Sequence, residues 1–321
     1  MKTTLLGILS AIICFTTELP AQFPPNDLVV IADRLNMRNA PKQDAEVVTT
    51  LNNGDVVQLL DPTADNSHNG ESINGLYGFW TKVKYRQFIG YVFSPYLGSK
   101  YMLFYENGEI EYYPKVKHWY GVFYDSIARR ERIKPIDTHT EKIFDTEFNQ
   151  EETHLLTNNP EKTLFIIATN EVLEERVIGD FMRNKPAAQY PESVRIKPGD
   201  EIYLNIPTKT TKNSDAYQLI ATGNYQLKYN RPILSDFKVF VTCQHQQYNS
   251  TSSIQNLSDH FGYSQVFALS YSGDIDNDDK PDIILVGESE GAMNFFLFLS
   301  SMAGKNEILR LVSTFSFYDK C

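Results

Sequence analysis

The sequence has little cysteine, an excess of acid over base and no recognisable catalytic motif, and each shortage excludes something. Its 30 lysines and arginines are outnumbered by 40 aspartates and glutamates, and the net charge of −10 argues against nucleic acid or an anionic membrane as a partner. The six histidines lack the spacing of a zinc site, and neither a Gly-x-Ser-x-Gly elbow nor a phosphate-binding glycine loop occurs. Beyond the N-terminal segment, no apolar run reaches the ~20 residues of a membrane-spanning helix. The sequence therefore favours a protein without catalysis.

The first 21 residues are typical of a secretory signal peptide. Met1-Lys2 supplies the positive start, Leu5 to Phe15 the apolar core, and Leu19-Pro20-Ala21 a cleavage site. We therefore expect an exported protein, in the periplasm, at the cell surface or secreted. Cys14 raises the alternative of a lipoprotein, but Ile13 precedes it where lipid-attachment sites have a small side chain.

Two cysteines, Cys243 and Cys321, remain after the signal peptide, and they allow a single intramolecular disulfide. In an oxidising compartment this bond would fix the last strand to the body of its domain, and the chain-entropy account gives it roughly 4 to 5 kcal/mol. The alternative is two buried thiols. As a nucleophile Cys243 is a poor candidate, because it lies in an expected strand and lacks the helix-start position that lowers a thiol pKa.

Alternating carboxylates near the C-terminus form the motif whose spacing specifies a ligand most directly. Asp274, Asp276 and Asp278 occupy every second position, and Asp282 follows just before the apolar run Ile283 to Val286. Calcium takes six to eight oxygen ligands, which such a loop supplies. With the carbonyl of Lys280 as a further ligand, the five residues predict a Ca²⁺ site. The alternative is a solvated acidic turn, in which the carboxylates would repel one another.

This stretch resembles the calcium loops of FG-GAP and integrin-like repeats, whose pattern is Gly-Asp-x-Asp-x-Asp-Gly-x-x-Asp followed by an apolar strand. It departs from that pattern at Asp279, which replaces a glycine at a position expected to need positive φ, a conformation that Asp tolerates better than most residues. A helix-loop-helix calcium hand is excluded, because the sixth and twelfth loop positions hold Asp279 and Leu285.

The segment 26–98 resembles the bacterial SH3-like (SH3b) domains. The resemblance rests on Leu28 to Ala32, Leu35-Asn36-Met37-Arg38-Asn39-Ala40-Pro41, Leu51 to Val57, Trp80-Thr81-Lys82-Val83 and Ile89-Gly90-Tyr91-Val92-Phe93. Gly54-Asp55 is expected to form a tight turn, and Gly90 to allow the close approach of two strands. Between Leu60 and Trp80 the many turn residues predict a long surface loop.

The resemblance implies a small β-barrel that binds cell-wall peptidoglycan or acts as a spacer beside another domain. Trp80, Tyr91 and Tyr96 are the candidate binding residues, as the walls of an aromatic groove. The alternative is that these rings pack the barrel.

Residues 99–193 are expected to form a β-rich middle region or linker, and residues 194–321 an antiparallel β domain that carries the calcium loop. Tyr101 to Tyr105 and Ile110 to Tyr113 flank an Asn-Gly pair, which predicts a hairpin. The charged stretch from Tyr124 to Thr157 predicts a short helix or an ordered linker. The fold class expected is therefore mainly β, with an N-terminal SH3-like barrel, a larger antiparallel domain and few helices.

The whole layout is similar to exported bacterial proteins that join an SH3b domain to a C-terminal Gly-Asp-x-Asp-x-Asp segment, a resemblance that brings no activity with it. We expect a non-catalytic exported binding or scaffold protein, with peptidoglycan or an envelope protein as its partner. The alternatives are a purely structural protein of the envelope and a cell-wall hydrolase whose site is assembled from distant residues.

Overall fold

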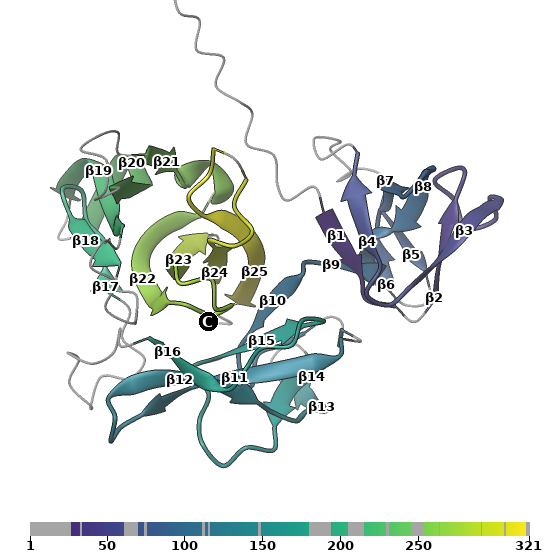
Figure 1. The fold of residues 1–321 in the computed structure, drawn as a ribbon, viewed down its shortest axis with the longest axis horizontal. Helices are drawn as coiled ribbons and strands as arrows, with labels where there is room; N and C mark the ends of the chain where they lie inside the picture. Colours follow the sequence, from purple (N-terminus) through teal and green to yellow (C-terminus); the bar gives the residue numbers. More distant parts are fainter. Residues whose placement is uncertain are drawn as a thin grey trace, which may run out of the picture.

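The computed structural model is built from antiparallel β-sheets (Figure 1). It describes residues 27–32, 34–60, 70–73, 76–110, 113–114, 116–146, 149–179, 194–204, 215–228, 231–244, 253–262, 264–289, 291–304 and 306–318. The predicted signal peptide, Cys14 and Cys321 lie outside these ranges. Within them every strand pairing is antiparallel, and the helical segments are two short 3-10 turns, η2 (Ser94–Tyr96) and η3 (Ser258–His260). The mainly β fold class is confirmed.

None of the described helical segments has the length and apolar character needed to cross a membrane. This finding concerns the described ranges alone.

The N-terminal unit is a seven-stranded sheet with a small core of its own. The strand order is β3 (Val47–Asn52), β2 (Arg34–Arg38), β8 (Phe88–Phe93), β7 (Trp80–Tyr85), β4 (Val56–Leu59), β1 (Asp27–Val30) and β9 (Leu97–Gly98). Alternate residues of β7 point inward, so that Thr81 and Val83 are buried while Lys82 and Lys84 are exposed. The core consists of Val30, Leu35, Met37, Leu51, Val57, Val83 and Val92.

Both glycines singled out in this unit have the expected role. Gly54 has a φ of +89°, in a turn closed by the Asp55 amide, which donates to the Asn52 carbonyl at 3.0 Å. A Cβ on Gly90 would lie 2.6 Å from the Arg38 carbonyl oxygen, so that only glycine lets these strands approach so closely. The expected long loop is partly wrong, because it contains a short hairpin of β5 (Glu71–Ile73) and β6 (Leu76–Gly78).

The described residues after the N-terminal unit form three further sheets and one hairpin. The middle sheet has the order β10 (Tyr101–Phe104), β15 (Phe165–Thr169), β11 (His118–Asp125), β12 (Arg130–Pro135) and β16 (Arg176–Gly179). The central sheet has the order β17 (Val194–Arg195), β22 (Gln265–Gly273), β23 (Asp282–Ser289), β24 (Ala292–Leu299) and β25 (Arg310–Tyr318). The outer sheet consists of β18 (Glu201–Leu204), β19 (Ala216–Lys228), β20 (Arg231–Gln244) and β21 (Ser253–Asn256), and β13 (Thr138–Asp145) pairs with β14 (Gln150–Thr157).

The central sheet is buried on both faces. In β24, Leu297 and Leu299 belong to a core shared with the middle sheet, whereas Phe296 and Phe298 belong to a core shared with the outer sheet. This alternation explains the continuous apolar runs of β23 and β24, since a strand covered on both sides has no polar face. Figure 1 shows the strands β22 to β25 between the outer-sheet strands and the middle sheet.

Two local predictions for the middle region are wrong. The Asn-Gly pair does not close a hairpin, because β10 pairs with β15 some 60 residues later, and Glu109 forms a bridge with His154. The stretch from Tyr124 to Thr157 contains neither a helix nor a plain linker in its described part, but the strands β12, β13 and β14. The first error arises because the partner of β10 is distant in sequence, whereas in the second stretch β12 pairs with the preceding strand β11, and β13 pairs with β14.

Candidate metal centre

The predicted calcium loop joins two central strands of the buried sheet. It runs from the end of β22 to the start of β23, where Gly273 and Asp282 form the last strand pair. One carboxylate oxygen from each of Asp274, Asp276 and Asp282 lies within 4.8 Å of the other two. The fold thus brings three of the four predicted carboxylates together.

The loop is wound around the Asp274 carboxylate. Its Oδ1 accepts hydrogen bonds from the amides of Asn277 at 2.7 Å and Asp278 at 3.2 Å, and its Oδ2 accepts one from the Asp279 amide at 3.3 Å. The tight winding places Asn277 at a φ of +70° and Asp279 at +62°. The expectation that Asp279 adopts positive φ is therefore confirmed.

Asp282 connects the loop to the end of strand β24 through a hydrogen bond from Ser300. This side chain is fully buried, and its two oxygens accept hydrogen bonds from the backbone amides of Ile275 at 2.7 Å and Ser300 at 2.9 Å. The Ser300 hydroxyl also donates to Asp278, at 2.9 Å from Oδ2. Asp278 therefore faces Ser300, outside the three-carboxylate cluster.

Asp276 has one carboxylate oxygen with a hydrogen-bond donor and one without. Its Oδ2 accepts a short hydrogen bond from the Ser301 hydroxyl. Its Oδ1 is shielded from solvent and has no hydrogen-bond partner among the described residues. A buried carboxylate oxygen without a donor is costly, and a cation is the ligand that would satisfy it.

The middle sheet clamps the loop from the side. Arg176 on β16 donates to the carbonyl oxygens of Asp274 at 3.2 Å and Ile275 at 2.8 Å, and its Nη2 lies 3.8 Å from Asp274 Oδ1. The Asp274 amide donates to the Ile178 carbonyl at 2.7 Å. The loop is thus held by a strand almost 100 residues earlier in the chain.

Burial opposes negative charge throughout this cluster. It raises the pKa of Asp274, of Asp276 and, most strongly, of the fully buried Asp282. Neighbouring carboxylates add to the rise, and hydrogen bonds from Ser301 and from the backbone amides act against it. Three carboxylates whose charged forms are disfavoured have the electrostatics that a divalent cation would reverse.

The residues thus fit a hard cation in ligand chemistry and in placement. Asp274, Asp276 and Asp282 would hold it directly. The assignments of Asp278 and of the Lys280 carbonyl as further ligands stay predictions, because the Asp278 carboxylate is engaged by Ser300 and Lys280 is an exposed residue whose amide donates to Asp278.

Three residues that build this site were not predicted from the sequence: Arg176, Ser300 and Ser301. The two serines directly follow an apolar strand, and that position was a visible signal. Arg176 gave none, because its approach to the loop depends on the packing of two sheets.

Two of the three predicted aromatic residues of the N-terminal unit belong to an aromatic cluster of Trp80, Phe93 and Tyr96. The ring centroids of Trp80 and Tyr96 lie 5.7 Å and 6.1 Å from that of Phe93. Trp80 is half-buried, and its indole nitrogen donates a short hydrogen bond to Glu71. Tyr91 lies two residues before Phe93 on β8, with the Lys82 amine 6.0 Å from its ring centroid. Trp80, Tyr91 and Tyr96 therefore remain partly accessible, whereas Phe93 is buried.

Cys243 is a buried residue of β20 in the core between the central and outer sheets. Burial raises the pKa of its thiol, the opposite of the shift that activates a cysteine nucleophile. Its predicted disulfide partner, Cys321, lies outside the described residues, so this bond stays a prediction.

Comparison with known families identifies residues 33–98 as a bacterial SH3 domain. The match covers the seven-stranded unit from β2 onward and ends with β9. No curated protein and no solved structure matches the chain. The likeness spans 66 of 321 residues, so it identifies this domain alone.

Proposed function

We propose that this is an exported, non-catalytic binding protein of the bacterial cell envelope, in which the SH3 domain binds cell-wall glycan or peptide. The family match supports this proposal, because related domains commonly bind peptidoglycan. The observation that carries it is the partial exposure of Trp80, Tyr91 and Tyr96, since exposed aromatic faces suit sugar rings and peptide side chains.

In the same proposal, the loop of Asp274, Asp276 and Asp282 binds Ca²⁺ and stabilises the three-sheet unit. The support is the convergence of three carboxylates and the unpartnered Oδ1 of Asp276. The ion would join β22, β23 and the residues after β24, and Arg176 links the same loop to the middle sheet. Its role would be to stiffen the body that carries the SH3 domain.

Co-sedimentation with purified peptidoglycan tests the binding function. The protein from residue 22 to residue 321 is mixed with sacculi in calcium and in chelator, and we expect it to pellet in both. Trp80→Ala should reduce the pelleted fraction several-fold, because the stacking surface is lost. Ile89→Ala is the matched control, since Ile89 is an exposed apolar residue of the same domain. Recovery of the wild-type protein in the supernatant would contradict wall binding.

The second candidate is a purely structural protein of the envelope, in which both units serve assembly. The observation that favours it is the packing of Trp80 and Tyr96 against Phe93. Equal pelleting of the wild-type protein and Trp80→Ala would support this candidate over the first.

A further inference from the structure

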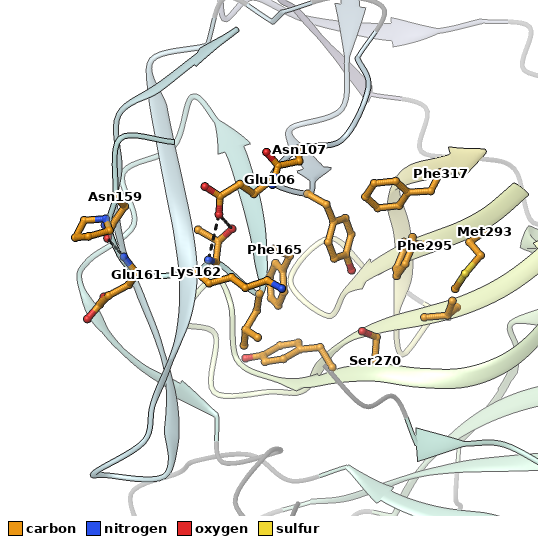
Figure 2. Close-up of a pocket in the computed structure, with 16 residues that line it drawn as sticks. Glu106, Asn107, Asn159, Glu161, Lys162, Phe165, Ser270, Met293, Phe295 and Phe317 are labelled. Atoms are coloured by element: carbon orange, nitrogen blue, oxygen red, sulfur yellow. Dashed lines mark hydrogen bonds between the residues drawn. The ribbon is translucent and has the colours of Figure 1, made fainter. Parts of the chain in front are cut away.

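A second site lies away from the carboxylate loop, in a cavity of about 710 Å³ between the middle and central sheets (Figure 2). Its volume falls within the range of small-molecule pockets. One wall is made by the segment after β10 and the loop before β15, and the other by strands β22 to β25. The cavity thus has one wall of strands from the central sheet and one wall made mainly of two loops of the middle region.

The apolar part of the lining is rich in aromatic rings. Tyr105 lies against Phe295 and Phe317, with ring centroids 4.4 Å and 5.6 Å away, and Phe165 meets Tyr271 edge-on at 5.1 Å. Because these rings hold one another in place, they form a preorganised surface for an apolar, ring-bearing body.

The polar part of the lining leaves one cation without a partner. Glu106 is turned toward the loop, where its oxygens accept hydrogen bonds from Thr157 at 2.8 Å and Thr163 at 3.1 Å. Glu161 is paired with Lys134. Lys162 makes no ion pair within the described ranges, and Figure 2 shows its side chain extending from the loop toward the aromatic side of the cavity.

A buried hydroxyl in the same lining is weakly partnered. The Tyr105 hydroxyl is shielded from solvent and makes no hydrogen bond of normal geometry with any described residue. A weak side-chain hydrogen bond with Ser270 lowers the pKa of this hydroxyl, against the larger rise caused by burial. A buried hydroxyl that is so weakly bonded is costly, and a ligand oxygen would satisfy it.

We propose that this cavity binds a small organic anion with an apolar, ring-bearing body. The aromatic walls would hold the body, Lys162 would pair with the anionic group, and the Tyr105 hydroxyl would donate to one of the ligand oxygens. This site is independent of both the SH3 domain and the carboxylate loop.

Two fluorescent probes that differ in charge test this assignment. Anilinonaphthalene sulfonate carries the anionic group, and phenylnaphthylamine has a similar ring system without it. We expect saturable binding of the sulfonate at one site per chain. Lys162→Gln should weaken sulfonate binding by roughly fivefold, as for an exposed ion pair, and leave the neutral probe unchanged. Lys238→Gln, at an exposed position outside the lining, is the matched control.

Two further variants separate binding from folding. Met293→Trp, at a partly exposed lining position, should fill the cavity and weaken both probes at least tenfold, with an unchanged melting temperature. Tyr105→Phe should weaken the sulfonate without lowering the melting temperature, since it removes a weakly bonded buried hydroxyl. The proposal is overturned by absence of saturable binding, by equal binding to wild type and Met293→Trp, or by equal loss of both probes in Lys162→Gln.

Discussion

The SH3 domain and the three-sheet unit bury their apolar residues in different ways. The SH3 core draws all its members from residues 30 to 92, whereas the core between the middle and central sheets combines residues 101 to 178 with residues 271 to 315. A core made of neighbouring segments leaves a sequence signature that a family comparison recognises. A core made of segments separated by 100 residues or more is harder to infer from a single sequence, because its pairing is decided by packing.

The two candidate sites differ in the same way: one is built from neighbouring segments and the other from distant ones. The aromatic cluster of the SH3 domain lies on the hairpin of β7 and β8 and on the short turn η2 that follows it. The carboxylate cluster needs the loop, the serines after β24 and Arg176 of the middle sheet. Its stability should therefore report on the packing of the whole three-sheet unit, while the SH3 domain should behave as an autonomous unit.

The largest expected effect comes from two matched core truncations. Leu297→Ala and Leu51→Ala each remove a fully buried leucine, at a cost of about 3 kcal/mol. Leu297→Ala should speed hydrogen exchange in both 101–179 and 264–318, because these segments share its core. Leu51→Ala should do so only in 27–98. Mass spectrometry of the exchanged peptides checks this, and spread of the Leu51→Ala effect into the central sheet would break the comparison.

Calcium should stabilise one unit only. At a free concentration of about a hundred times its dissociation constant, calcium should add about 2.7 kcal/mol to the unfolding free energy of the three-sheet unit and nothing to that of the SH3 domain. Asp276→Asn should remove most of this gain. The measurement is thermal unfolding in calcium and in chelator. A calcium response that survives in Asp276→Asn would argue against the proposed ligand set.

Arg176 should matter less, and in a calcium-dependent way. Arg176→Gln removes the donor to the Asp274 and Ile275 carbonyls, and we expect a loss of about 1 to 2 kcal/mol in chelator. The loss should be smaller in calcium, because the ion then supplies the positive charge that the guanidinium provided. Urea unfolding in both conditions measures it, with Arg195→Gln as the control at an exposed position. Equal losses of unfolding free energy in calcium and in chelator would show that the contribution of Arg176 does not depend on the ion.

The smallest effect concerns His260, which lies beside Phe298 with a buried Nε2 that has no hydrogen-bond partner among the described residues. Burial lowers the pKa of this imidazole below its unfolded value. The unfolded chain therefore takes up the proton first, so the contribution of His260 to stability is complete above about pH 6.5 and is lost as the pH falls below it.

The His260 effect is measured as a difference between two proteins. Urea unfolding at pH 7.5 and pH 5.5 should show a larger loss on acidification for the wild-type protein than for His260→Gln. The same loss in both would assign the pH dependence to groups other than His260.

Local chemistry made part of this molecule predictable. Alternation of apolar residues indicated the strands of the SH3 unit, and the Asp spacing located the loop, while the positive φ of Asp279 was implied by the resemblance to known calcium loops. One failure lay where a local signal competed with a distant partner. The Asn-Gly pair after β10 favours a hairpin, but β15 offered that strand a buried partner and prevailed.

The sequence by itself determined the β character of the chain, the presence of its SH3 domain and the position of its acidic loop, because each depends on residues that are neighbours along the chain. Only the tertiary structure decided that β24 presents Leu297 to one core and Phe298 to another, that Arg176 reaches the loop, and that Lys162 faces an aromatic cavity. These arrangements depend on how separate sheets pack, and packing is a property of the whole set of buried surfaces rather than of any one segment.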